Sequence, residues 1–91
     1  MDNQAVAKRF AENLQAARAA SGLTIDALAA RSEIHRSQVS EILGARADAR
    51  LTTILRLAGA LKVDPSELIE GLAFEPADRI GEFKVKPAKE S

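Results

Sequence analysis

The sequence predicts an all-α domain made of five short helices. Its composition indicates this class, because 46% of the 91 residues are hydrophobic but only 3% are aromatic, which suits a small bundle rich in alanine and leucine. Apolar residues also recur at intervals of three and four, the period of an amphipathic helix. A chain of this length fits one domain. We expect that domain to cover residues 1–72, followed by a tail over 73–91.

The first predicted helix begins at about Asp2 or Asn3 and ends at Ala20. Gly22 follows it, and glycine tolerates the positive φ that commonly ends a helix. The apolar residues of this segment share one face at helical spacing: Val6, Phe10, Leu14 and Ala17.

The second and third predicted helices, Ile25 to Arg31 and Arg36 to Leu43, are separated by a turn at 32–34. Thr24 can cap the second helix, and Asp26 places a negative charge near its positive end. The third helix has a narrow apolar stripe, at about 100° per residue, formed by Val39, Ile42 and Leu43. Its opposite face is small and polar. Such a helix can lie in the DNA major groove, which is about 12 Å wide.

The fourth predicted helix covers Leu51 to Leu61, with an inward face of Ile54, Leu57, Ala58 and Leu61. A well-formed helix start follows. Asp64 caps it, Pro65 takes the first position, and Glu67 can complete a capping box. The fifth predicted helix therefore covers about Pro65 to Leu72.

Three stretches of this sequence resemble one known family. They are LTIDALAARSEIHRSQVSEILG at 23–44, ARAASGLT at 17–24 and LTTILRLAGALKVDPSEL at 51–68. Together they resemble the helix-turn-helix, the end of helix one, and helices four and five of the XRE family, which includes the lambda-type phage repressors and Cro. The resemblance covers roughly residues 6–72 without gaps. It implies a five-helix lambda-repressor-like DNA-binding domain, with the helix-turn-helix at helices two and three.

The resemblance also implies which residues contact DNA. It places base-reading positions at the start and outer face of the third helix, here Arg36, Ser37, Gln38, Ser40 and Glu41. The loop that follows would track the phosphate backbone, where Arg46 and Arg50 can each neutralise a phosphate. Backbone N–H groups at Thr24 and Ile25 can meet another phosphate. The alternative for each side chain is a solvated polar residue on the surface.

The sequence departs from the family pattern at several positions. Ile25 replaces a glutamine that contacts phosphate, and Ala45 replaces a glycine. Glu33 stands where the turn usually has glycine, and a left-handed conformation there would cost about 1 kcal/mol or more. Leu43 replaces the glutamate that usually pairs with the arginine of helix one. That arginine, Arg18, is therefore exposed, paired elsewhere or available for phosphate.

The charge is unevenly distributed along the chain. Although the whole chain has no net charge, residues 1–62 hold nine Lys or Arg and six Asp or Glu, which gives +3. Residues 63–91 hold four and seven, which gives −3. The basic excess thus falls on the part that contains the predicted DNA-contacting residues.

The tail contains one segment, 82–86, that alternates polar and apolar residues like a half-buried strand. A lone strand needs a partner edge. One alternative is a frayed tail, and the other is a strand that pairs with its copy in a dimer or docks on another protein. For a homodimer, the apolar residues available late in the chain are Leu68, Leu72, Phe74, Ile80, Phe83 and Val85.

We therefore predict a sequence-specific DNA-binding transcriptional regulator, a repressor that acts as a homodimer on a two-fold-related operator in double-stranded DNA. The alternative is an antitoxin or another interaction module of the same fold, whose tail binds a protein such as a toxin. The chain has no Cys, no Tyr, one His (His35) and no Gly-rich phosphate loop, so we expect no enzyme, metal site or other cofactor. It also lacks the ~18-residue apolar run of a membrane span, which favours a cytoplasmic protein.

Overall fold

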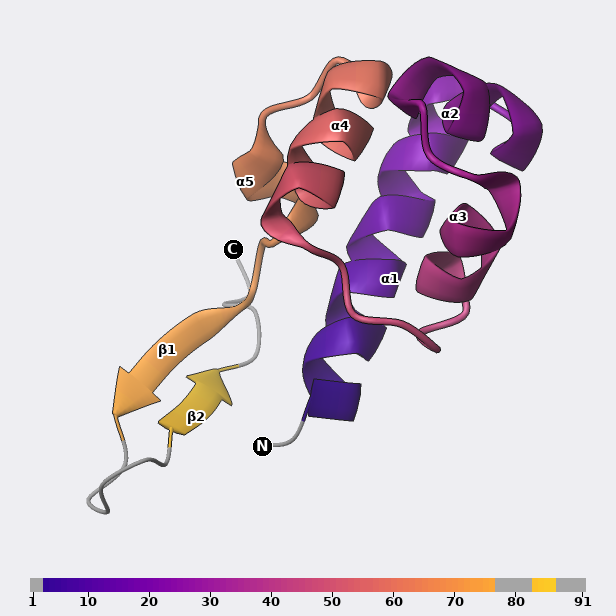
Figure 1. Ribbon diagram of the computed structural model, residues 1–91. Helices are drawn as coiled ribbons and strands as arrows, with labels where there is room; N and C mark the ends of the chain where they lie inside the picture. Colours follow the sequence, from indigo (N-terminus) through magenta and orange to yellow (C-terminus); the bar gives the residue numbers. More distant parts are fainter. Residues whose placement is uncertain (1–2, 77–82, 87–91) are drawn as a thin grey trace.

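The computed structural model describes residues 3–76 and 83–86, and consists of five helices followed by a β-hairpin (Figure 1). Helix α1 is central, with α2 and α3 on one side and α4 and α5 on the other. This confirms the predicted helical fold. The elements are α1 (Asn3–Ser21), α2 (Ile25–Ser32), α3 (Arg36–Leu43), α4 (Leu51–Leu61), α5 (Pro65–Leu68), β1 (Ala73–Pro76) and β2 (Phe83–Lys86).

The core receives at least one fully buried side chain from each helix. The largest of these side chains, each less than 2% exposed, are Leu14, Leu28, Val39, Ile42, Leu57 and Leu68. The predicted inward face of α4 is largely confirmed, because Leu57, Ala58 and Leu61 are buried and Ile54 is half-buried. Thr53, which the apolar pattern did not select, is buried as well.

Two predicted helix caps are present. The backbone N–H of Ala27 donates to the Thr24 hydroxyl at 3.0 Å, which fixes the start of α2. At α5, the N–H of Ser66 donates to the Asp64 carboxylate at 2.9 Å, and Glu67 accepts from the N–H of Asp64 at 3.2 Å. The pKa of Asp64 is lowered, chiefly because its carboxylate accepts that bond from the Ser66 backbone.

Helix α5 is shorter than the sequence predicted, since it ends at Leu68 and not at Leu72. The amide of Asn13 on α1 donates to the carbonyl of Leu68 at 3.0 Å and to that of Glu70 at 2.8 Å. Gly71 then takes a φ of 87°, which turns the chain away from the helix. The carbonyl of the last residue of α5 is therefore bound by a side chain that lies 55 residues earlier in the sequence.

The tail contains the predicted strand, and the partner edge that it needs lies within the same chain. β2 pairs antiparallel with β1, with Phe74 opposite Val85 and Pro76 opposite Phe83. Proline at the end of a short edge strand is tolerated, because it removes only one donor. Position 82, predicted as the start of the strand, and Ile80 lie outside the described residues.

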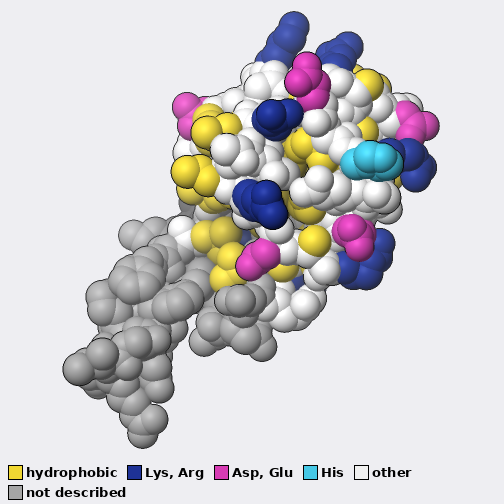
Figure 2. Space-filling view, viewed as in Figure 1, with side chains coloured by type: hydrophobic (Ala, Val, Ile, Leu, Met, Phe, Trp, Pro, Cys, Tyr) yellow, Lys and Arg dark blue, Asp and Glu magenta, His cyan; other side chains and the backbone are white. Residues whose placement is uncertain are grey.

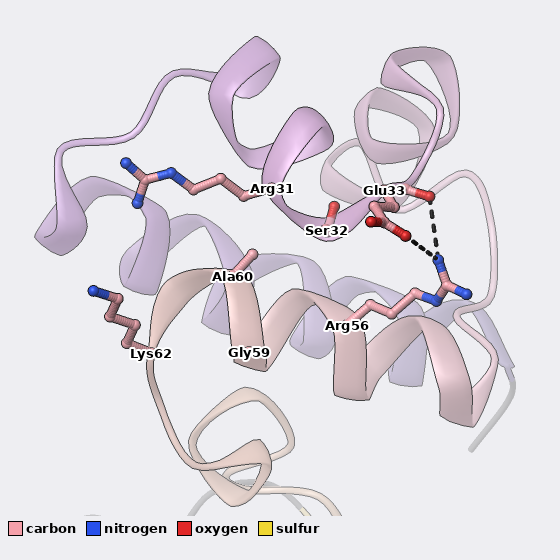
Figure 3. Close-up of a pocket in the computed structure, with 7 residues that line it drawn as sticks. All are labelled: Arg31, Ser32, Glu33, Arg56, Gly59, Ala60 and Lys62. Atoms are coloured by element: carbon pink, nitrogen blue, oxygen red, sulfur yellow. Dashed lines mark hydrogen bonds and ion pairs between the residues drawn. The ribbon is translucent and has the colours of Figure 1, made fainter.

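The turn between α2 and α3 contains a non-glycine residue in the left-handed conformation. Glu33 has φ 58° and ψ 38°, and its N–H closes the end of α2. Figure 3 shows Arg56 of α4 reaching this turn, where its Nη1 lies 3.4 Å from the Glu33 carbonyl oxygen and 3.8 Å from the Glu33 carboxylate. A residue with a Cβ is strained in this conformation, by about 1–2 kcal/mol.

The substitution Glu33→Gly is therefore expected to raise the free energy of unfolding by about 1 kcal/mol, measured by urea denaturation. The ion pair with Arg56 offsets little, because the two side chains are 83% and 54% exposed and such pairs contribute weakly. The matched control is Ala30→Gly in α2, which should lower stability by about 1 kcal/mol. A destabilised Glu33→Gly variant would show that the contacts with Arg56 outweigh the backbone strain.

Candidate nucleic-acid interface

Helix α3 presents a polar outer surface because its apolar side chains are used inside. Val39 and Ile42 are at most 1% exposed and anchor the helix on the core. Leu43 is half-buried against the same core, whereas the polar side chains point outward to different degrees. Of the predicted base-reading residues, Ser40 is half-buried and the others are exposed: Arg36, Ser37, Gln38 and Glu41.

An ion pair joins the first turns of α2 and α3. The Nε of Arg36 donates to the Oδ1 of Asp26, and the two side chains are 61% and 74% exposed. This contact joins the start of α3 to the start of α2, the two helix ends that the sequence predicted to approach DNA. The sequence predicted only that the Asp26 charge stabilises the N-terminal end of its own helix.

The start of α3 has a weak cap. His35 occupies the N-cap position, but its side chain makes no capping bond to a backbone N–H of the helix. Its Nδ1 lies 3.3 Å from the Ser37 hydroxyl instead. The described residues include no group of three or more His, Cys, Asp or Glu side chains placed to hold a metal ion.

The loop between α3 and α4 is held by the body of the protein while its arginines stay exposed. The amide of Gln4 on α1 donates to the Ala45 carbonyl at 3.1 Å, and the N–H of Arg46 donates to the Glu41 carbonyl at 2.8 Å. The Arg46 guanidinium lies against Gly44, where an added Cβ would collide with it. Arg50 is exposed at the N-cap of α4 and makes no side-chain cap bond.

Thr24 and Arg18 have partners within the chain. The Thr24 oxygen accepts the capping bond from Ala27, so its own O–H is left to donate outward. Arg18 donates from Nη1 to the Leu23 carbonyl at 2.7 Å and from Nε to the Gln15 side chain at 3.2 Å. Of the three alternatives for Arg18, the structure therefore shows the one in which it is paired elsewhere.

Hydrophobic side chains gather along the side formed by α4 and α5, whereas basic and acidic side chains alternate on the rest of the face in Figure 2. Among the described residues, the exposed large hydrophobics are Leu51 at 71%, Leu55 at 50% and Ile69 at 43%. Sequence reasoning missed all three. Leu68, which it assigned to a dimer contact, is 0% exposed and closes the core of the monomer.

Comparison with known proteins finds a helix-turn-helix family and solved structures of regulatory proteins. The model of the family described as "Helix-turn-helix domain" matches residues 9–70. The restriction-modification controller protein C.AhdI from Aeromonas hydrophila is 36% identical, with a TM-score of 0.68 over 70% of this chain and 97% of its own. A hypothetical transcription factor, NHTF from Neisseria, is 28% identical, with a TM-score of 0.68 over 76% of this chain and 79% of its own.

An HTH_3 family transcriptional regulator from Vibrio cholerae has the same fold at 19% identity, with a TM-score of 0.71 over 74% of this chain and 38% of its own. Comparison with curated proteins gives no match. None of the helices that the structure describes is both long enough and apolar enough to cross a membrane. The chain belongs to the helix-turn-helix domain family and has the fold of DNA-binding transcription regulators.

Proposed function

We propose that this protein binds a specific sequence in double-stranded DNA through α3 and regulates transcription there as a repressor. The observation that carries the proposal is the division of α3 into a buried apolar stripe and an exposed polar face, with Arg46 and Arg50 exposed in the loop that follows. The match to C.AhdI, a controller protein, supports a regulatory role. The resemblance to lambda-type repressors favours repression over activation.

The exposed side chains of α3 fit the edges of bases in the major groove. Arginine can donate two hydrogen bonds to guanine, glutamine can pair with adenine, and glutamate can accept from cytosine N4. Arg36, Gln38 and Glu41 supply these three chemistries on one short helix. Ser37 and Ser40 are small enough to let the helix backbone approach the floor of the groove.

Arg46 and Arg50 are expected to contact phosphates, together with the Thr24 hydroxyl and the start of α2. Changing Arg46 or Arg50 to alanine should weaken binding to every DNA sequence and flatten the dependence of log K on log salt by about 1 unit per lost contact. Fluorescence anisotropy over a salt series measures both quantities. The matched control is Arg31→Ala, because Arg31 is exposed at the other end of α2. If the slope is the same in wild type and both loop variants, the loop does not contact the backbone.

We also propose that the protein acts as a homodimer through the α4–α5 side. Two copies related by a two-fold axis would place their α3 helices about 34–36 Å apart, one turn of DNA. The exposed Leu51 and Leu55 lie on α4, the exposed Ile69 directly follows α5, and Leu72 is half-buried just before β1. From the tail, Phe74, Phe83 and Val85 belong to the same proposal. The alternative role of the tail, binding a partner protein such as a toxin, stays a prediction.

Sedimentation of three forms tests this contact. The full chain should be a dimer at tens of micromolar, and Leu55→Ser should shift it toward monomer. A chain that ends at Glu75 lacks β2, and its oligomeric state shows whether the pair of strands contributes to the dimer. A monomeric full chain would defeat the dimer proposal, and an unchanged dimer for Leu55→Ser would move the contact away from α4.

A further inference from the structure

The contact between Asp26 and Arg36 carries an inference that rests on the proposed DNA binding. We propose that Asp26 is a positioning residue for Arg36, and that the protein therefore prefers guanine at one position of its DNA site. The Nε of Arg36, the first residue of α3, donates to the Asp26 carboxylate, which belongs to the first turn of α2.

The exposure of the pair argues against a mainly stabilising role. The side chains of Arg36 and Asp26 are 61% and 74% exposed. Ion pairs this exposed contribute little to the stability of a fold, because water and salt screen them. What the contact does determine is the direction in which the guanidinium points.

The chemistry of arginine makes that direction important. Its guanidinium is planar and carries five N–H donors in a fixed arrangement. With Nε–H donated to Asp26, the two Nη groups remain, and they form the fork that can donate to O6 and N7 of one guanine. Because the group is rigid, fixing Nε also fixes where this fork points. An unpaired Arg36 could instead swing to a phosphate, which carries no sequence information.

Asp26 raises selectivity at one base, but it lowers the overall affinity for DNA. It places a negative charge at the start of α2, where the proposed interface meets phosphates. That charge repels DNA of any sequence, and removing it should increase binding that depends on the backbone. Asp26 therefore lowers affinity for DNA in general and raises selectivity at one base. A residue with only a structural role would not shift these two quantities in opposite directions.

The test compares wild type, Asp26→Asn and the control Asp48→Asn, which removes the same charge from an exposed residue of the α3–α4 loop. Each full-length protein is used to select sites from random duplex DNA, and its affinity is then measured for the selected site, for that site with single guanines replaced, and for unrelated duplex. Arg36→Ala identifies the guanine that depends on Arg36. Melting temperatures confirm that each variant is folded.

Asp26→Asn should bind unrelated DNA more tightly than wild type and lose about ten-fold in preference for that guanine, within the range of a bidentate contact. Asp48→Asn should also bind unrelated DNA more tightly, but should keep the preference. In an Arg36→Ala background, adding Asp26→Asn should leave base preference unchanged. If Asp26→Asn keeps the full preference, or if no selected guanine depends on Arg36, the inference is overturned while the proposed function stands. If wild type selects no motif, the proposed function falls and the inference falls with it.

Discussion

Replacing Leu28 by alanine is expected to lower the free energy of unfolding by about 2–5 kcal/mol, measured by urea denaturation followed by circular dichroism. Leu28 is 0% exposed, and it belongs to the same core cluster as Val39 of α3 and Leu57 of α4. Its truncation leaves a cavity in the core, which the surrounding side chains fill only in part. For a domain whose total stability is typically about 5–15 kcal/mol, this is a large fraction.

The control for this prediction is Lys8→Ala. Lys8 is exposed on α1 and lies outside the proposed dimer contact, so its truncation to alanine should alter stability by no more than about 0.5 kcal/mol. Similar losses in the two variants would contradict the assignment of Leu28 to the core. The Leu28 variant should also bind DNA less well near its unfolding midpoint, because α3 depends on α2 for support.

The second large effect is expected in base preference. Changing Ser37, Gln38 or Glu41 to alanine should alter the DNA sequence that the protein selects, at a different position for each variant. Each well-formed base contact contributes about 1–3 kcal/mol of discrimination between bases. The melting temperature should hardly change, since all three side chains are exposed. Site selection with each variant measures the preference, and calorimetry measures the melting temperature.

Gln15→Ala provides the control for these three variants. Gln15 is an exposed polar residue of α1, and its removal should leave the selected sequence unchanged. An identical motif for wild type and all three α3 variants would mean that bases are read elsewhere or not at all.

Local signals in the sequence were sufficient to predict most of the helices. The bounds of α3 and α4 agree with the prediction, because an apolar stripe and flanking turns define both helices. The end of α5 was not predictable in this way, since it depends on the Asn13 side chain of α1. The partner of β2 was missed as well. The segment 73–76 is short and ends in proline, so its pairing with 83–86 is what identifies it as a strand.

In the candidate site, too, local sequence signals predicted some features, whereas others depend on contacts between helices. The sequence identified which residue types lie on the outer face of α3, because helical periodicity is enough to place them. It did not reveal that Arg36 meets Asp26 or that Arg18 meets the Leu23 carbonyl. Such contacts depend on how two helices cross and on which rotamer a long side chain takes. Leu51 and Leu55 lie outside the inward face predicted for α4, but periodicity alone does not show which apolar residues the rest of the fold leaves uncovered.

Selection of sites from random duplex DNA by the full-length protein shows whether α3 reads a DNA sequence. We expect an enriched motif made of two inverted half-sites, with centres about 10 base pairs apart. If no sequence is enriched at any salt concentration from low to physiological, α3 does not read DNA.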